Sequence, residues 1–273
     1  MYPDMVTRVL DLRHLTWSVT RQSSGTAGSF LKAYEERGGR KRYFKLSSFD
    51  AFQGITGHEC VNELIADRLL TRLGIPHLSY TLIHANVQID GADYCTWLCA
   101  SDDFKEPGES KTAFDVFFQM ERLTGESAFA FCGRKGWKEW AEQILLVDYL
   151  VLNRDRHGGN IEILQNRSAR TVCPAPLFDH GLSLMCSCHE EEALAKFDVM
   201  EDRPVQSFLG SRSARKNLEL ISADFWEKLG TLREKDLDAV LEGLEEVLTE
   251  THLLKIREML KRRWDLVESI RNS

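Results

Sequence analysis

The chain has 273 residues, of which 43% are hydrophobic, so it can bury the core of one large domain or of two lobes. Its formal net charge of −7 argues against a general binder of nucleic acids or of anionic membranes. No apolar run reaches the roughly 18–20 residues of a membrane span, and the first residues do not form a signal peptide pattern. We therefore expect a cytoplasmic protein that binds no membrane and no nucleic acid directly.

The first hundred residues have a mainly strand-like pattern. Gly38-Gly39 and Asp90-Gly91 are typical of the tight turns of hairpins. One amphipathic helix is predicted over 58–73, because apolar residues recur there at steps of three and four and Gly74 with Pro76 ends the pattern. The expected strands cover 15–19, 30–34, 42–46, 80–83, 87–89 and 94–98.

After about residue 105 the pattern becomes helical. Helices are predicted over 113–123 and 137–152, and over 236–248 and 252–270 within a helical run from about residue 223. The turn-rich segment 101–108 separates the two parts. We expect an α+β fold with a small antiparallel-sheet lobe at 1–104 and a mostly helical lobe at 105–273.

The seven cysteines include no CxxC pair, which favours reduced thiols over disulfides. Cys186, Cys188 and His189 have part of a zinc-ligand pattern, but a second pair at ligand spacing is missing. We therefore expect no zinc there.

The most informative segment is Asn153-Arg154-Asp155-Arg156-His157-Gly158-Gly159-Asn160, which follows the predicted helix 137–152 and precedes a short predicted strand at 161–164. In a phosphoryl-transfer site Asp155 would orient the attacking hydroxyl, and Asn160 would offer a neutral oxygen to magnesium. Gly158 and Gly159 would leave room for phosphate. The alternative is an ordinary polar turn capped by Asp155 and Asn160.

Asp179 is the second expected magnesium ligand. It follows the apolar segment 175–178, which we expect to be a strand that directs the carboxylate into a cleft, and Gly181 would permit a bend. A helix cap or a turn would also suit this aspartate. His180 is equally compatible with packing and with catalysis.

Lys45 lies between apolar residues of a predicted strand, where an ammonium needs an anion. Phosphate oxygens would satisfy it, and Glu63 on the predicted helix would hold it in position, with Glu59 as the competitor one turn away. A lysine at a sheet edge and a surface carboxylate are the alternatives. The backbone of the segment 23–29 would cover the phosphates of ATP, and its expected nucleotide-binding residues are Ser24, Gly25, Thr26 and Gly28.

With these residues in view, the chain resembles the HipA-like kinases, bacterial serine/threonine kinases best known as toxins of toxin–antitoxin systems and distantly related to phosphatidylinositol kinases. The resemblance covers most of the chain. It is carried by Tyr43-Phe44-Lys45, Asn62-Glu63, Arg68-Leu69-Leu70, Leu73-Gly74-Ile75, the segment Asn153 to Asn160, and Pro176-Leu177-Phe178-Asp179.

The resemblance implies a two-lobed protein-kinase-like fold that uses ATP and Mg²⁺. Lys45 would contact the α- and β-phosphates, Glu63 would pair with Lys45, Asp155 would be the catalytic aspartate, and Asn160 and Asp179 would hold the metal. It also implies a protein substrate, an antitoxin or small accessory protein as partner, and autophosphorylation in the glycine-rich loop. The positions available for that modification are Ser23, Ser24, Thr26 and Ser29.

Two departures and two alternatives accompany this hypothesis. The longest family members carry a further N-terminal subdomain, and the HRD and DFG signatures of eukaryotic protein kinases are absent here. A lipid or small-molecule kinase is one alternative. It would need a basic surface facing the membrane, and the only such cluster near the small lobe, Arg37, Arg40, Lys41 and Arg42, is explained more simply by a charged hairpin tip. An ATP-binding pseudokinase is the other, and the presence of Lys45, Asp155, Asn160 and Asp179 argues against it.

Overall fold

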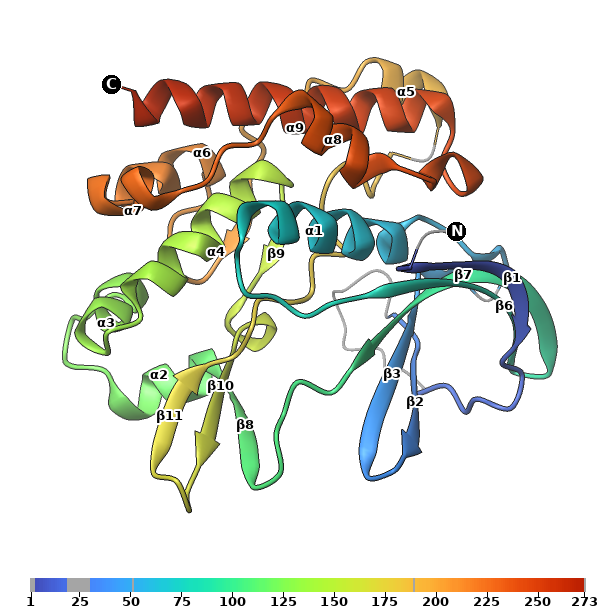
Figure 1. The fold of residues 1–273 in the computed structure, drawn as a ribbon, viewed down its shortest axis with the longest axis horizontal. Coiled ribbons are helices and arrows are strands. Elements are labelled where there is room, and N and C mark those ends of the chain that lie inside the picture. Colours follow the sequence, from blue (N-terminus) through green and yellow to red (C-terminus); the bar gives the residue numbers. More distant parts are fainter. Residues whose placement is uncertain (1–2, 19–29, 51, 189, 273) are drawn as a thin grey trace.

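The computed structural model describes residues 3–18, 30–50, 52–188 and 190–272 (Figure 1). The first half contains β1 (Met5–Asp11), β2 (Lys32–Arg37), β3 (Arg40–Leu46), β4 (Phe49–Asp50), β5 (Gly54–Ile55), α1 (Glu59–Leu73), β6 (Thr81–Ile89) and β7 (Ala92–Asp102). Five of these strands form one sheet in the order β1-β6-β7-β3-β2, in which only β1 and β6 pair in parallel.

The predicted hairpin turns are confirmed. Gly38 and Gly39 have φ values of +60° and +77° between β2 and β3, and Asp90 and Gly91 have +51° and +83° between β6 and β7. Two successive residues with positive φ match the right-handed twist of the strands on either side. The register of both hairpins is thereby fixed.

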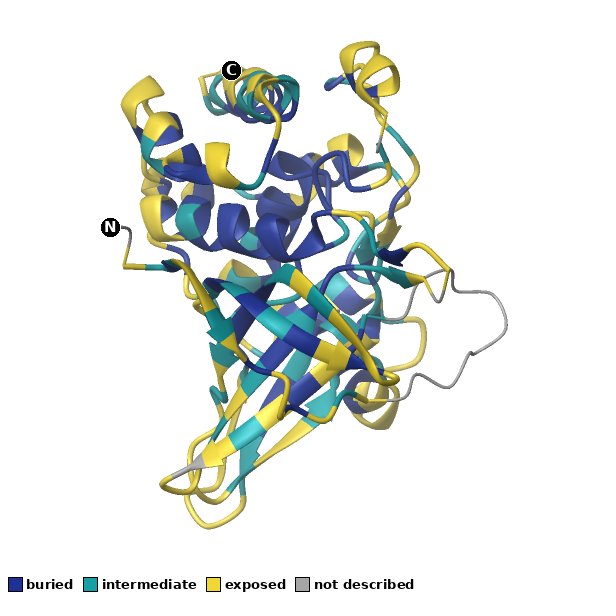
Figure 2. Ribbon diagram, turned by 90° about the vertical axis from the view of Figure 1, so that its right-hand side faces the viewer, coloured by how far each residue is buried: buried dark blue, intermediate teal, exposed yellow. Residues whose placement is uncertain are grey.

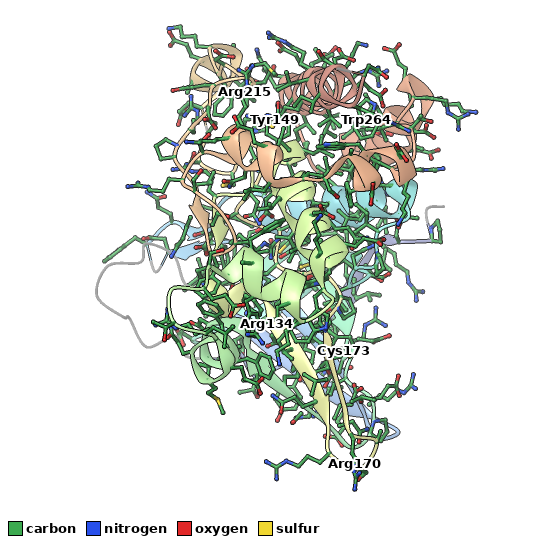
Figure 3. All side chains as sticks on the ribbon, turned by 90° about the vertical axis from the view of Figure 1, so that its left-hand side faces the viewer. Arg134, Tyr149, Arg170, Cys173, Arg215 and Trp264 are labelled. Carbon is green, nitrogen blue, oxygen red and sulfur yellow. The ribbon has the colours of Figure 1, made fainter. Side chains whose placement is uncertain are left out.

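The second half is mainly helical. It contains β8 (Glu109–Ala113), α2 (Phe114–Glu121), α3 (Ala128–Arg134), α4 (Lys138–Leu150), β9 (Asp155–Arg156), η1 (Gly158–Asn160), β10 (Glu162–Asn166), β11 (Thr171–Pro174), α5 (Glu191–Ala195), β12 (Gln206–Ser207), α6 (Ala214–Asn217), η2 (Leu218–Leu220), α7 (Ala223–Lys228), α8 (Glu234–Leu241), η3 (Leu244–Glu246) and α9 (Glu250–Arg271). A second sheet has the order β11-β10-β8, and Arg170 marks the tip of its β10–β11 hairpin, far from Tyr149 and Trp264 in the helical layer (Figure 3).

Helix α1 joins the two halves because it lies between the five-stranded sheet and the C-terminal helices (Figure 1). Its side chains are buried on almost every side, as the dark central helices of Figure 2 show. Arg68 of α1 connects this helix to both halves. Its guanidinium donates to the carbonyls of Val240 and Glu242 at 3.1 and 2.7 Å. It also forms an ion pair with Asp4, with an N–O distance of 2.7 Å. The position of α1 is therefore fixed relative to both the five-stranded sheet and the C-terminal helices.

Three expectations about secondary structure were wrong. The strand expected at 15–19 is absent over its described residues 15–18, and the first strand is β1, which the sequence analysis missed. The helix expected over 236–248 ends at Leu241, because Gly243 adopts a φ of +77° that an α-helix does not accommodate. The segment 175–178 is not a regular strand and makes only a single bridge, between Leu177 and His77. Within the described residues no helix is both long and apolar enough to cross a membrane.

Candidate functional site

Lys45 is the centre of a buried charge cluster. It lies on β3 opposite Lys32 of β2 and Cys99 of β7. Its Nζ is 2.7 Å from Oε1 of Glu63 on α1 and 2.6 Å from Oδ1 of Asp179. Burial alone would lower the pKa of the Lys45 ammonium, but the two carboxylates outweigh this effect and place that pKa well above its usual value.

Glu63 has no exposed surface and uses both carboxylate oxygens. Oε1 accepts from Lys45, and Oε2 accepts from the backbone N–H of His180 at 2.8 Å. The competitor Glu59 is directed elsewhere, since its Oε2 accepts from the backbone N–H of Ser48 at 3.2 Å. One carboxylate of α1 thus holds both the lysine of the sheet and the backbone beside Asp179.

Asp179 is positioned by a bend. Its own φ is +59°, a left-handed conformation that is unfavourable for residues with a side chain. The segment before it is fixed by Leu177, whose N–H donates to Pro76 and whose carbonyl accepts from Leu78 at 2.8 Å. The segment after it is fixed by Asn62 of α1, whose Nδ2 donates to the carbonyls of Gly181 and Ser183 at 2.9 and 3.0 Å.

Gly181 has a packing role at this bend. A Cβ there would lie 3.3 Å from Glu63 Oε1 and 3.3 Å from Glu59 Cβ, so the backbone approaches α1 closely. The left-handed bend itself is at Asp179, two residues earlier than the position suggested by the sequence.

The segment that contains Asp155 is held by a buried ion pair. Arg156 is 2% exposed, and its Nη2 lies 3.0 Å from Oδ1 of Asp148, which points from the last turn of α4. Nη1 of Arg156 also donates to the carbonyls of Asn160 and Phe178 at 3.0 and 2.7 Å. This guanidinium therefore ties the start of the loop, its end and the segment that leads to Asp179.

Asp155 and Asn160 face one another across the loop. Nδ2 of Asn160 donates to the Asp155 carbonyl at 2.8 Å, with Oδ2 of Asp155 at 3.4 Å. Burial raises the pKa of the Asp155 carboxyl above its usual value; His157 opposes the rise and Asp179 adds to it. Burial also favours the neutral form of Asp179, but Lys45 and Lys32 reverse this, and the pKa of Asp179 lies below its usual value. At neutral pH the site thus presents one strongly stabilised carboxylate and one more basic carboxylate.

The role expected for Gly158 is corrected by its packing. A Cβ at Gly158 would lie 2.4 Å from Cβ of Asp115, so the missing side chain lets the loop pack against α2. The space on that side is filled by protein and is not available to phosphate.

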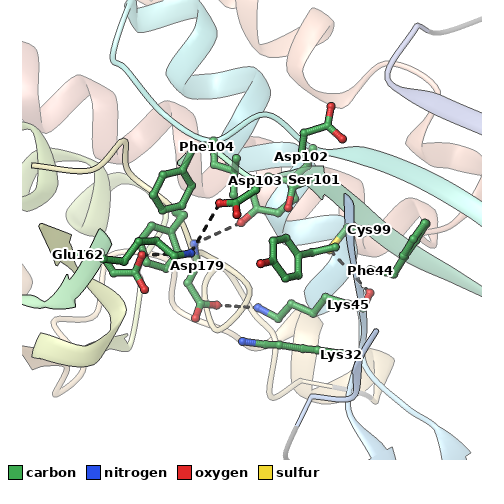
Figure 4. A pocket seen from close by; sticks show the side chains of 15 residues that line it. Lys32, Phe44, Lys45, Cys99, Ser101, Asp102, Asp103, Phe104, Glu162 and Asp179 are labelled. Atoms are coloured by element: carbon green, nitrogen blue, oxygen red, sulfur yellow. Dashed lines mark hydrogen bonds and ion pairs between the residues drawn. The ribbon is translucent and has the colours of Figure 1, made fainter. Parts of the chain in front are cut away.

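A cavity of about 240 Å³ opens beside the charge cluster (Figure 4). Apolar and aromatic side chains line much of it, including Leu78, Tyr80, Phe104 and Phe178, while Lys32, Lys45 and Asp179 lie at one end. Figure 4 shows the two lysines side by side and directed towards Asp179. The cavity thus combines an apolar part, suited to a flat ring system, with a cationic end suited to phosphates.

The donor set near Asp179 suits magnesium. Magnesium prefers hard oxygen ligands, and the carboxylate of Asp179 and the amide oxygen of Asn160 are of this kind. Nδ2 of Asn160 donates to Asp155, and Oδ1 of Asn160 has no hydrogen bond within the described part of the chain. Over the same residues no group of three or more His, Cys, Asp or Glu side chains is arranged to hold a metal. Asn160 and Asp179 alone would leave most ligand positions of a magnesium ion to water and to nucleotide phosphates.

The segment 23–29, with Ser23, Ser24, Gly25, Thr26, Gly28 and Ser29, lies outside the described residues. Its expected role over the phosphates remains a prediction.

Three contributors to this site were not singled out from local sequence patterns. Asp148 is a carboxylate within the apolar run of α4, and an isolated buried charge of this kind signals a partner, here Arg156. Lys32 follows Leu31 and precedes Ala33, the same pattern that singled out Lys45. Asn62 was recognised only as part of the family resemblance, and no local pattern predicts its contacts with residues 181 and 183.

Comparison with known proteins identifies the class of fold. No protein-family model matches the chain, and no curated protein matches its sequence. The arrangement of an antiparallel-rich sheet, one crossing helix and a helical C-terminal part is nevertheless that of a kinase-like fold. The expected α+β kinase-like fold class is confirmed.

One solved structure that shows this fold is a proinflammatory kinase of Helicobacter pylori, CtkA. It superposes with a TM-score of 0.67 at 16% identity, over 96% of this chain and 97% of that one. A complex of HipA, HipB and operator DNA, from a toxin–antitoxin system of Shewanella oneidensis MR-1, matches with a TM-score of 0.47 at 16% identity, over 93% of this chain and 67% of that one. At such identities the likeness concerns the fold, and the relation to HipA-like kinases beyond the fold stays a prediction.

Proposed function

We propose that this protein is a kinase that uses ATP and Mg²⁺ to phosphorylate serine or threonine hydroxyls of a protein. The observation that carries the proposal is the convergence of Lys45, Glu63 and Asp179 at the cationic end of the cavity, with the sequential pair Asp155 and Asn160 on the adjoining loop. Four segments of a kinase-like fold, well separated in the sequence, supply these groups.

Lys45 is proposed to bind the α- and β-phosphates, with Glu63 holding the ammonium in place. Lys32 adds a second positive charge at the same end of the cavity. Two lysines directly opposite on antiparallel strands repel one another, so anions at this position stabilise the sheet as well as the ligand. Within the described residues, Glu63 and Asp179 supply two of these anions, and the triphosphate of ATP would supply further negative charge.

Asn160 and Asp179 are proposed to hold magnesium, which when bound would neutralise charge on the transferred phosphoryl group. Asp155 is proposed to orient the acceptor hydroxyl and take its proton. Its raised pKa suits this role, because a more basic carboxylate is a better proton acceptor. Catalysis would rest on alignment and charge stabilisation, without a phosphoenzyme.

We also propose the division into a nucleotide-binding lobe, 1–104, and a helical lobe, 105–273. It is supported by the end of β7 at Asp102 and by the pairing of β8 with β10 of the helical half. Within the first lobe, Ser24, Gly25, Thr26 and Gly28 are proposed to cover the phosphates, and Ser23, Ser24, Thr26 and Ser29 to be autophosphorylation positions. By the sequence resemblance, a protein substrate and an antitoxin-like accessory protein are the proposed partners.

The test is incubation of the pure protein with γ-labelled ATP and magnesium, followed by mass spectrometry of the intact protein and its peptides. The Asp155→Asn variant is run beside the wild type. Asp90→Asn, an exposed isosteric change at the β6–β7 turn, is the matched control. Label on the wild type and the control but not on Asp155→Asn is the expected result. Label that is independent of Asp155, or a phosphate found only outside 23–29, would contradict the catalytic role or the autophosphorylation site respectively.

A further inference from the structure

Two buried thiols lie directly behind Lys45. Cys60 is on the first turn of α1, and Cys99 is on β7 opposite Lys45 in the sheet; each is 1% exposed. The sulfur of Cys60 lies 3.1 Å from the Lys45 carbonyl oxygen, and the sulfur of Cys99 lies 3.8 Å from the same oxygen. Two cysteines from different elements thus share one backbone acceptor.

The environment makes the two thiols chemically different. Burial would raise the pKa of the Cys60 thiol, but the hydrogen bonds from Cys99 and Ser47 and the charge of Lys45 lower it below its usual value. The hydrogen bond to Cys60, together with burial, raises the pKa of Cys99 well above its usual value. A thiol that ionises first beside one that stays protonated matches the division between an attacking and a resolving cysteine.

One member of the pair faces a cavity that a small oxidant can enter. Cys99 lines the cavity of about 240 Å³ that contains Lys45 and Asp179. The other buried thiols differ in this respect: burial raises the pKa of Cys132 to about 12 and that of Cys186 to about 11, and neither lines this cavity. An oxidant that enters the cavity therefore meets Cys99, whose sulfur shares the Lys45 carbonyl oxygen with the sulfur of Cys60.

We infer that Cys60 and Cys99 form an oxidisable dithiol site, which a hydroperoxide converts to an intramolecular disulfide. One thiolate of the pair attacks the peroxide oxygen, giving a sulfenic acid and, after protonation, one molecule of water. The other sulfur then displaces the sulfenic oxygen as a second water, forming the S–S bond. Two thiols lose two electrons and two protons, and hydrogen peroxide is reduced to two waters. The inference does not depend on the proposed kinase activity.

The location gives this modification a direct route to the charge cluster. In the disulfide neither sulfur donates a hydrogen bond to the Lys45 carbonyl. The bond would also join β7 to the turn of α1 that lies one turn before Glu63. Both partners of the Lys45–Glu63 ion pair are thus carried by backbone that the disulfide constrains.

The test uses the full chain with the two exposed cysteines, Cys95 and Cys173, replaced by serine so that intermolecular bonds are suppressed. The folded protein is treated with one equivalent of hydrogen peroxide, alkylated, digested without reductant and analysed by mass spectrometry. The expected result is loss of two hydrogens and a linked peptide pair containing Cys60 and Cys99, which dithiothreitol separates.

Cys132→Ser, at a buried thiol remote from this pair, is the matched control and should retain the link. Cys99→Ala should leave Cys60 unlinked and open to modification by a sulfenic-acid probe. The inference is overturned if both thiols of the folded protein remain free for alkylation, if they oxidise to sulfinic acid without linking, or if the link forms only in denaturant. Because the pairing in the chain that keeps both Cys60 and Cys99 is decisive by itself, a further variant that fails to fold does not remove the test.

Discussion

The ammonium of Lys45 and the carboxylate of Asp179 lie 2.6 Å apart, although 134 residues separate them in the sequence. Glu63 approaches the same ammonium from α1 at 2.7 Å. The Lys45 side chain is 11% exposed and Glu63 is not exposed at all, so solvent screens these contacts little. Removal of the cation would leave two carboxylates close together and poorly hydrated, which is more costly than losing one contact.

Replacement of Lys45 by methionine is therefore expected to lower the free energy of unfolding by about 3–5 kcal/mol, the range for breaking a buried pair from one side. Chemical denaturation at neutral pH measures the change. Adding Glu63→Gln to the methionine variant should recover part of the loss, because one unpaired carboxylate is then neutral.

The matched control for this prediction is Lys196→Met. Lys196 pairs with Glu192 at the surface, where the side chains are 74% and 82% exposed, so its replacement should change the free energy of unfolding by less than about 0.5 kcal/mol. An equal loss in the two variants would show that burial of the Lys45 cluster adds nothing to its stability.

Replacement of Asp155 and of Asp179 by asparagine is expected to impair different steps, turnover in the first case and nucleotide binding in the second. Asp155→Asn should preserve binding of magnesium and ATP and lower turnover by about 10²–10⁴-fold, since it removes a proton acceptor. Asp179→Asn should weaken magnesium-dependent nucleotide binding, since it removes the charged metal ligand and a partner of Lys45. Isothermal titration and initial rates separate the two effects, and equal loss of binding in both variants would contradict the assigned roles.

The sequence predicted local features of this fold better than distant ones. The helix α1, the β2–β3 and β6–β7 turns and the helix α9 follow from periodicity and from glycine positions, which are properties of neighbouring residues. Strand β1 was not predicted, because its residues do not alternate cleanly between buried and exposed positions. Its parallel pairing with β6 is a contact between distant parts of the sequence.

The same limit applies to the site. Lys45 and Asp155 stand out because of their types and their flanking residues, but the left-handed bend at Asp179 does not. That bend depends on the backbone hydrogen bonds of Leu177 with the segment after α1. It also depends on Asn62, whose amide donates to the carbonyls of residues 181 and 183. These contacts join residues that are far apart in the sequence. The sequence could therefore suggest Asp179 as a site residue but not the contacts that orient its carboxylate.

Gly158 provides a test of how closely the loop of Asp155 is packed. In Gly158→Ala the new Cβ would meet Asp115 of α2 at 2.4 Å, so α2 or the loop must move, which is expected to destabilise the protein by about 1–3 kcal/mol. Gly133→Ala is the control, because Gly133 is helical and a Cβ there has no neighbour within 4 Å. It should stabilise by about 0.5–1 kcal/mol, and thermal denaturation of the pair measures the contrast.

His180 predicts a pH dependence of folding. It is 2% exposed, and its Nε2 has no hydrogen-bond partner within the described residues. Burial and the nearby charge of Arg156 lower its pKa well below the usual 6.5, so the folded protein keeps this imidazole neutral. Below pH 6.5 the unfolded chain binds a proton that the folded chain does not, and stability should fall by up to about 1.4 kcal/mol per pH unit from this group.

The measurement is urea denaturation of the wild type and of His180→Gln between pH 7.5 and about 5, where the carboxylates still stay largely ionised. The difference in unfolding free energy between the two proteins should be constant above pH 7 and should shift in favour of the variant as the pH falls, because glutamine takes no proton in either state. A constant difference between wild type and His180→Gln over the whole range would mean that the folded protein accommodates a protonated His180, and the buried neutral state assigned to it would be wrong.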